Sequence, residues 1–162
     1  MSMAPLVLDP ASGSRMMWFD REDPRVLFGD IRQESHILCD GRTLEITPDE
    51  LMDFRDLPLD DGTFQLVVFD PPHLRRAGQN SYMARKYGTL DRETWQADLA
   101  QGFKECFRVL KPHGVLIFKW NETQIPLSQI LPLALPHRPL FGHRSGKTAR
   151  THWMTFMKDA ET

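Results

Sequence analysis

The sequence contains no apolar run that approaches the roughly 18 residues of a membrane span, and it contains no linker rich in Gly, Ser and Pro. Its start, MSMAPLVLDP, has neither a basic segment nor a long apolar stretch, so we expect no signal peptide and a cytoplasmic location. Only two cysteines are present, Cys39 and Cys106, and their spacing matches no CxxC or Cys/His pattern. We expect both to be buried or half-buried free thiols, and we expect no metal site.

What the chain does contain is the composition of a single ordinary domain. Its 162 residues are 41% hydrophobic and 26% charged, which suits one compact core. The net charge of −2 conceals an uneven distribution, because residues 1–70 hold 15 Asp and Glu against 6 Lys and Arg, whereas residues 71–162 hold 7 against 14. A basic half of this kind favours a polyanionic partner.

Short apolar runs and one longer periodic segment predict an α/β fold. The runs that predict strands are residues 6–8, 26–28, 66–69, 115–118 and 153–157. Residues 92–110 predict a helix, since apolar side chains recur there at three- and four-residue spacing: Trp95, Leu99, Phe103, Cys106 and Leu110. A second helix over 127–135 would be kinked or ended by Pro132. We therefore expect one Rossmann-like domain with a mostly parallel central sheet and an antiparallel C-terminal strand.

Two further segments predict turns. Apolar and polar residues alternate on both sides of Asp40 and Gly41, which predicts a small hairpin insertion near residues 36–46 with a type I′ turn. Residues 142–146, bounded by glycines, predict the turn between the last two strands.

Polar residues follow the expected strands at the edge where an open parallel sheet binds ligands. The first strand is followed by Asp9 and by a turn of small residues (Ala11, Ser12, Gly13), which lets a ligand approach the backbone closely. Asp30 follows the second strand at 17 residues beyond Gly13, a spacing similar to that of the acid that binds ribose hydroxyls in nucleotide-binding βαβ units. Taken singly, each of these features is as common in ordinary turns and solvated loops.

The tetrapeptide Asp70-Pro71-Pro72-His73 ends the strand predicted over 66–69. An amino group on an aromatic ring is a poor nucleophile because its lone pair is delocalised, and hydrogen bonds accepted from both amino hydrogens make it more nucleophilic. The Asp70 carboxylate could accept one such bond and the carbonyl of Pro71 the other. His73 could stack on the face of the base. The alternative is a Pro-Pro turn that only ends the strand.

In its order of motifs the chain resembles the class I S-adenosylmethionine (SAM)-dependent methyltransferases. The resemblance rests on the small-residue loop, the acid after the second strand, the segment from Asp53 to Asp61, and the double-proline motif. It is strongest with the amino-methyltransferase branch that carries an [Asp/Asn/Ser]-Pro-Pro-[aromatic] motif, in small stand-alone bacterial and phage enzymes. It spans about Leu8 to Lys158.

The resemblance implies a role for each matching position. Residues that would bind SAM are Asp9, Ala11, Ser12, Gly13, Asp30, Asp53 and Phe54. Within this set, Asp30 would bind the ribose hydroxyls and Asp53 the adenine amino group. The target amine would lie at Asp70, Pro71, Pro72 and His73, with His in the position of the commoner aromatic residue.

Two stretches without any acidic residue, 71–90 and 137–153, carry interleaved basic and aromatic residues. Solvated charged loops are the ordinary explanation for either stretch alone. Because both are expected near the active site, they favour a nucleic-acid substrate. The resemblance to DNA amino-methyltransferases implies DNA more than RNA. The residues expected to contact it are Arg75, Arg76, Tyr82, Arg85, Lys86, Arg144 and Lys147. Lys119 and its neighbours could add to the pocket.

The sequence thus predicts transfer of a methyl group from SAM to adenine N6 in DNA. The same chemistry could act on rRNA or tRNA, on cytosine N4, or on a protein glutamine amide. A module that binds SAM and regulates without catalysis is a further alternative. Such a short chain could also function as a homodimer.

Overall fold

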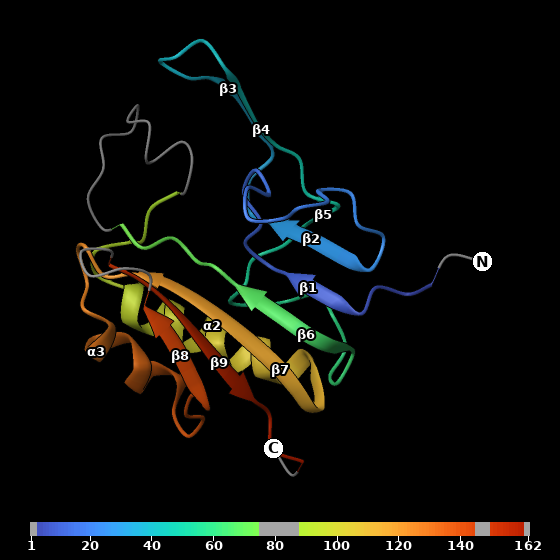
Figure 1. Cartoon of the computed structure of the whole chain (residues 1–162), viewed down its shortest axis with the longest axis vertical. Helices are drawn as coiled ribbons and strands as arrows, with labels where there is room; N and C mark the ends of the chain where they lie inside the picture. Colours follow the sequence, from blue (N-terminus) through green and yellow to red (C-terminus); the bar gives the residue numbers. More distant parts are fainter. Residues whose placement is uncertain (1–2, 75–87, 145–149, 161–162) are drawn as a thin grey trace.

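The computed structural model describes residues 3–74, 88–144 and 150–160, and a seven-stranded sheet forms its centre (Figure 1). The strands are β1 (Val7–Asp9), β2 (Val26–Asp30), β5 (Glu50–Leu51), β6 (Phe64–Phe69), β7 (Leu110–Asn121), β8 (Phe141–Arg144) and β9 (Thr151–Met157). Their order across the sheet is β5-β2-β1-β6-β7-β9-β8. All five strands predicted from the apolar runs are present.

The first five strands in this order pair in parallel, and β9 runs antiparallel to both β7 and β8. It follows that β8 has the same direction as β7 and that β9 alone is reversed. The expected architecture, a mostly parallel sheet with an antiparallel C-terminal strand, is confirmed. The order reverses between β1 and β6, which is the switch point at which such sheets bind ligands.

A single long helix, α2 (Trp95–Val109), packs against one face of the sheet and confirms the helix predicted over 92–110. Its side chains Leu99, Phe103 and Cys106 are fully or almost fully buried against strand residues such as Phe69 and Phe118. The rings pack edge-on in this core, with Phe69 and Phe103 centroids 5.6 Å apart. Most of the apolar core therefore lies in the layer between α2 and the sheet.

The second predicted helix is shorter than expected and changes type part-way. An α-helical turn, α3 (Leu127–Ile130), continues directly into a 3-10 helix, η1 (Leu131–Ala134). Pro132 lies in the first turn of η1, where its missing N–H costs no hydrogen bond. Ile130 and Ala134 join the same core as α2, so all helices of the described ranges lie on one side of the sheet.

The predicted hairpin is present as β3 (Glu34–Ile37) and β4 (Thr43–Ile46), and it extends away from the sheet (Figure 1). The type I′ prediction for its turn was wrong. That turn needs positive φ at both central residues, whereas only Gly41 has it, at 83°. The link instead spans five residues, closed by the Leu38 N–H donating to the Arg42 carbonyl. Cys39 lies exposed on this link, contrary to expectation, while Cys106 is buried.

The prediction of a turn over residues 142–146 was wrong for its first half. Gly142 lies within β8, paired with Met154 of β9, because the apolar and aromatic residues around it extend the edge of the sheet. Residues 145–149 lie outside the described ranges. None of the described helices is long and apolar enough to cross a membrane.

Candidate active site

A pocket of about 430 Å³ opens at the carboxyl ends of β1, β2, β6 and β7. Its volume lies in the range of small-molecule sites, roughly 300–1,000 Å³. Of the residues predicted to bind a cofactor or the target amine, those that line it are Ala11, Ser12, Gly13, Asp30, Asp53, Phe54, Asp70, Pro71, Pro72 and His73. Residues up to 62 positions apart in the sequence meet here because parallel strands present their ends at one edge.

The loop after β1 is fixed to the end of β2. Gly13, with a φ of 52°, donates its N–H to Asp30 Oδ2 at 2.8 Å, and Ser12 donates its own to the Gly29 carbonyl at 2.9 Å. The Asp30 side chain is almost fully buried, and its other oxygen accepts from Arg32. Ser12 Oγ is buried at the pocket without a hydrogen-bond partner among the described residues. A polar ligand in the pocket could satisfy that hydroxyl.

Asp9 differs from the expectation, because it lies behind the pocket wall and not on it. Its side chain has no exposed surface, and Oδ2 accepts from Trp18 Nε1 at 2.7 Å. The pKa of Asp9 is raised to about 7, mainly by burial and in smaller part by the nearby carboxylates of Asp70 and Asp30, while the Trp18 hydrogen bond opposes the rise. Its bond to the Ala11 N–H, at 3.3 Å, supports the loop that lines the pocket.

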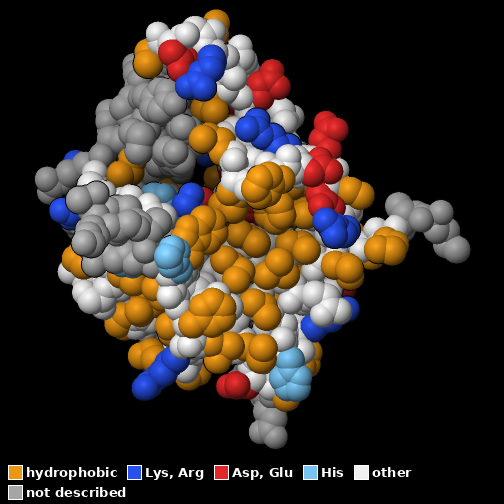
Figure 2. Space-filling view, viewed as in Figure 1, with side chains coloured by type: hydrophobic (Ala, Val, Ile, Leu, Met, Phe, Trp, Pro, Cys, Tyr) orange, Lys and Arg blue, Asp and Glu red, His pale blue; other side chains and the backbone are white. Residues whose placement is uncertain are grey.

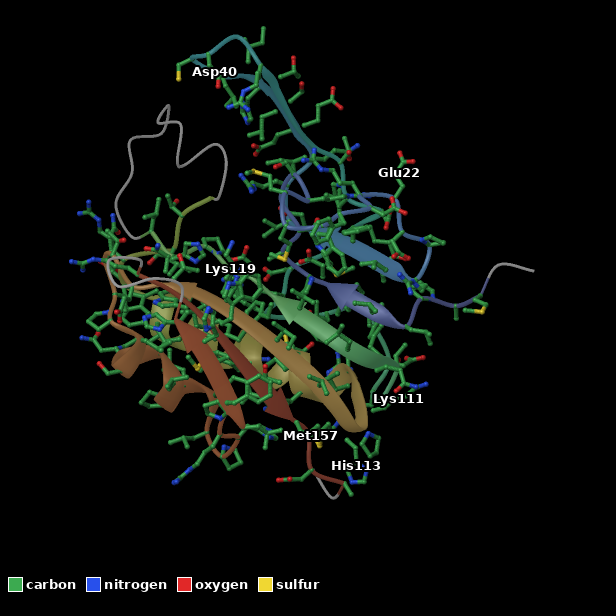
Figure 3. All side chains as sticks on the ribbon, in the orientation of Figure 1. Glu22, Asp40, Lys111, His113, Lys119 and Met157 are labelled. Atoms are coloured by element: carbon green, nitrogen blue, oxygen red, sulfur yellow. The ribbon has the colours of Figure 1, made fainter. Side chains whose placement is uncertain are left out.

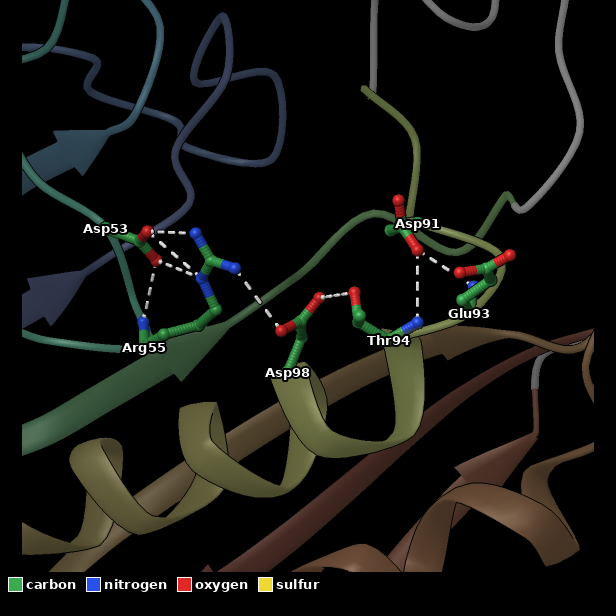
Figure 4. Close-up of polar contacts among 6 residues, drawn as sticks. All are labelled: Asp53, Arg55, Asp91, Glu93, Thr94 and Asp98. Carbon is green, nitrogen blue, oxygen red and sulfur yellow. Dashed lines mark hydrogen bonds and ion pairs between the residues drawn. The ribbon is translucent and has the colours of Figure 1, made fainter.

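Asp53 lies in an ion-pair chain that reaches the first turn of α2 (Figure 4). Arg55 binds both oxygens of Asp53, at 2.6 to 3.0 Å, and its other nitrogen lies 3.3 Å from Asp98 Oδ1. The guanidinium lowers the pKa of Asp53 and keeps that carboxylate charged. Phe54, beside it in the sequence, packs edge-on against Phe69 at 5.2 Å.

Asp70 presents one oxygen to Lys119 and leaves the other without a hydrogen bond. Lys119 Nζ, from the end of β7, lies 3.4 Å from Asp70 Oδ2, at the opposite end of that strand from Lys111 and His113 (Figure 3). Asp70 Oδ1 is buried and accepts no hydrogen bond from the described residues, and His73 Nε2 lies 3.9 Å from it. Burial raises the pKa of Asp70 to about 6, although Lys119 opposes the rise. The carboxylate is therefore an acceptor in need of a donor.

His73 is held as a neutral ring. Its pKa is lowered to about 4, mainly by burial and in part by the Lys119 cation. The ring packs edge-on against Trp120, with centroids 5.4 Å apart. Trp120 itself is fully buried and donates to the Ile125 carbonyl, so it belongs to the core.

The pocket also contains residues that the sequence analysis did not select. These are Met16, Met17, Ile31, Arg32, Met52, Arg55, Thr89, Leu90, Asp91 and Asp98. Asp91 and Asp98 could have been found, because a helix that follows a strand of an open sheet begins at the ligand-binding edge. Met16 and Met17 carried no signal in the sequence, since their place depends on how the connection after β1 folds back.

Most of the residues predicted to contact a substrate fall outside the described ranges: Arg75, Arg76, Tyr82, Arg85, Lys86 and Lys147. The backbone of Arg144 is the last position of β8. Within the described ranges, no group of three or more His, Cys, Asp or Glu side chains is arranged to bind a metal ion.

Neither a family model nor a curated protein sequence matches the chain. Solved structures do. A protein of Pyrococcus horikoshii, PH0226, superposes with a TM-score of 0.60 at 18% identity, covering 94% of this chain and 81% of that one. A TehB-like SAM-dependent methyltransferase from Corynebacterium glutamicum gives 0.60 at 14% identity, covering 94% and 79%. A SAM-dependent methyltransferase from Methanosarcina mazei gives 0.53 at 12% identity, covering 96% and 92%.

These similarities define the class of fold. The chain has the Rossmann-like α/β fold of the SAM-dependent methyltransferases, with its pocket at the switch point of the sheet. At such low identities the fold is what the structures share, so the activity has to be argued from the site itself.

Proposed function

We propose that the chain is a SAM-dependent N-methyltransferase that acts on an exocyclic amino group of a nucleobase, with adenine N6 in DNA as its target. One observation carries the proposal: Asp70 Oδ1 is a buried acceptor without a hydrogen-bond partner among the described residues, directly before the Pro71 carbonyl at the pocket wall. A buried carboxylate oxygen of this kind is costly unless a ligand donates to it. An amino group is such a donor.

The pocket residues fit the proposed cofactor. Ser12 Oγ, buried and unsatisfied among the described residues, and the backbone of Gly13 would contact its polar end. Asp30 would accept from ribose hydroxyls, and Asp53 would accept from the adenine amino group, with the ring of Phe54 alongside. When bound, SAM supplies a methyl group already activated by its sulfonium. The chain therefore has to position the nucleophile more than activate the donor.

The residues of the double-proline motif would orient the amine. Asp70 Oδ1 would accept one amino hydrogen and the Pro71 carbonyl the second, which draws the nitrogen lone pair out of conjugation. Lys119 engages Oδ2 and so leaves Oδ1 as the oxygen available to the substrate. His73, neutral near pH 7 because its pKa is lowered to about 4, could stack on a base without adding charge.

The choice of a nucleic acid rests on charge. Residues 71–162 hold 14 Lys and Arg against 7 Asp and Glu, and basic residues cluster directly after His73 in the sequence. The same site chemistry would serve rRNA or tRNA, cytosine N4, or a protein glutamine amide. We favour DNA because the motif resembles that of the DNA amino-methyltransferase branch.

The test is transfer of labelled methyl from SAM into DNA, RNA and protein offered in parallel, followed by nucleoside analysis of the labelled pool. We expect label in N6-methyladenine of DNA. Label in another pool would change the assigned substrate and leave the assignment as a SAM-dependent methyltransferase in place.

The variant Asp70→Asn should bind the product S-adenosylhomocysteine in calorimetry and lose transfer by at least about a hundredfold. Binding without transfer in the unmodified chain would instead identify a regulatory module, and undiminished turnover in Asp70→Asn would exclude the proposed mechanism.

A further inference from the structure

One face of the central sheet has no helix over it in the described ranges. In a doubly wound sheet, right-handed connections on the two sides of the switch point cover opposite faces. The connection from β6 to β7 contains α2 and covers one face. The connection from β1 to β2, residues 10–25, forms turns and no helix, so on the opposite face it covers only the side chains near β2, such as Phe28.

Strand register identifies the side chains on this open face. Val7 pairs with Leu66, Leu66 with Val115 and Val115 with Met157, so these four lie on the same side of the sheet. Ile117 lies two residues along from Val115. We call the set Val7, Leu66, Val115, Ile117, Phe141 and Met157 the open face; Phe141 belongs to it because it and Ile117 both pair with Thr155.

Exposure differs sharply between the two sides of the same strands. The alternate residues Leu8, Val67, Leu116 and Phe156, which point toward α2, each have 0% of their surface exposed. On the open face, Met157 is 44% and Phe141 66% exposed, and the other four are half-buried. Figure 2 shows the result as a continuous apolar area across the middle of the molecule. Parallel sheets are almost always covered on both faces, so this arrangement calls for a partner.

The open face is bordered by further apolar side chains and only then by charge. Trp18 packs on Phe28, with ring centroids 5.3 Å apart, so the connection after β1 covers the end of β2 on this side. The next residue, Phe19, is fully exposed. Charge begins at the carboxyl end of β7, where Lys119 lies over the ring of Trp153.

We infer that a second copy of this chain packs on the open face, so that two sheets meet face to face around a two-fold axis. The six residues of the face and Thr155, which lies between Ile117 and Phe141, carry no charge, and the nearest charge along β7 on this side is Lys119 at the edge. Such a surface is complementary to itself, whereas a charged partner would lose hydration there without gaining an ion pair. Apolar faces of twisted sheets pack about 10 Å apart at roughly −30°.

The size of the face agrees with a dimer of low affinity. With strands about 4.8 Å apart and residues about 3.3 Å apart, the area from β1 to β8 is on the order of 300 Å² in projection. This is smaller than the roughly 800 Å² per partner of a standard interface, although Phe141 and Met157 protrude from the face, so we expect weak association. We expect a dimer populated above about 10 μM, near the weak end of specific association.

The inference does not depend on the proposed function, and sedimentation of the unmodified chain over a concentration series tests it. We expect a reversible monomer–dimer equilibrium. The variant Ile117→Glu should weaken dimerisation at least about tenfold, because it buries an unpaired charge at the centre of the face. The matched control is Leu135→Glu, which adds the same charge at a residue 55% exposed beside η1, on the other layer, and should leave the equilibrium unchanged.

A second pair of variants separates lost association from lost folding. Ile117→Lys and Ile117→Glu should each be monomeric, and mixing them should restore a heterodimer, because we place the two-fold axis at the centre of the face, where residue 117 meets its own copy. The milder variant Ile117→Thr, which keeps the β-branched shape, should fold and bind more weakly. A monomer at all concentrations up to about 100 μM would overturn the inference. A dimer equally stable in Ile117→Thr and Ile117→Glu would place the interface elsewhere, and binding of a different protein in preference to a second copy would also overturn it.

Discussion

Lys119 Nζ, at the carboxyl end of β7, lies 3.4 Å from Asp70 Oδ2, at the carboxyl end of β6. The two side chains come from neighbouring parallel strands and point to the same side of the sheet. Lys119 opposes the effect of burial on Asp70, whose pKa is nonetheless raised to about 6. The pair therefore links the protonation of the proposed amine acceptor to a residue 49 positions further along the chain.

The first prediction concerns the pH dependence of activity. Asp70 accepts an amine hydrogen only when ionised, so methyl transfer should fall as pH drops through about 6. Lys119→Met removes the charge that favours the ionised form, and the acid limb of the pH–rate profile should move to higher pH. Lys119→Arg should keep the limb near its original position. His73 and Asp9 are other titratable groups close to Asp70. Because the Lys119 cation lowers the pKa of His73, Lys119→Met should also raise that pKa. An unshifted limb in Lys119→Met would show that Lys119 does not control Asp70.

The second prediction concerns stability and Asp9. Its pKa is raised in the folded state to about 7, so the folded form resists ionisation and the free energy of unfolding should fall as pH rises from about 4 to about 7. Each pKa unit corresponds to about 1.4 kcal/mol, which sets an upper limit of roughly 4 kcal/mol for this group. Asp9→Asn keeps an acceptor for Trp18 and cannot ionise, so it should unfold at higher denaturant concentration than the unmodified chain at pH 8, with little difference at pH 4.

Chemical denaturation at pH 4 and pH 8 measures that effect. The exposed variant Asp20→Asn is the control, and its stability should follow that of the unmodified chain at both pH values. If Asp9→Asn and the unmodified chain lost stability equally between pH 4 and pH 8, ionisation of Asp9 would not be the cause.

The third prediction concerns a close contact beneath the pocket. A Cβ added at Gly102 in α2 would lie 2.7 Å from Phe54 Cδ2 and 2.9 Å from Phe69 Cζ. Gly102→Ala should displace Phe54, which lines the pocket, and overpacking of this kind costs about 1–3 kcal/mol. We expect weaker binding of S-adenosylhomocysteine in calorimetry together with a lower thermal midpoint. The control is Gln101→Ala at the adjacent exposed helix position, for which both quantities should stay close to those of the unmodified chain.

The fourth prediction concerns the basic residues after the double-proline motif. Replacing Arg75 and Arg76 together by Glu should weaken binding of nucleic acid and reduce its dependence on salt, while affinity for S-adenosylhomocysteine stays the same. Fluorescence anisotropy with a labelled DNA duplex at several salt concentrations measures the first effect. An unchanged salt slope would mean that these arginines do not contact the phosphate backbone.

The sequence alone determined those elements whose pattern lies within a short stretch of neighbouring residues. The run around Val67 and the helix around Phe103 were predictable because periodicity and apolar content are properties of neighbouring residues. The same holds for the motif from Asp70 to His73, whose position after a strand places it at the ligand-binding edge of the sheet. The expectation that the C-terminal strand would run antiparallel was also correct, although β8, the strand that pairs with β9 at the edge of the sheet, was not predicted.

Tertiary structure decided what depends on distant partners. Asp9 looked like a pocket residue from its place after β1, yet Trp18 folds back over it and buries it. The pairing of Lys119 with Asp70 required the register of β6 against β7, which no local pattern specifies. The exposure of the open face, finally, could not be predicted from Val115 and Ile117. Strands that are covered on one face and strands that are covered on both faces contain the same kinds of apolar residue. That face is uncovered within the described ranges because the connection from β1 to β2 forms turns and no helix, and the tertiary structure was needed to show this.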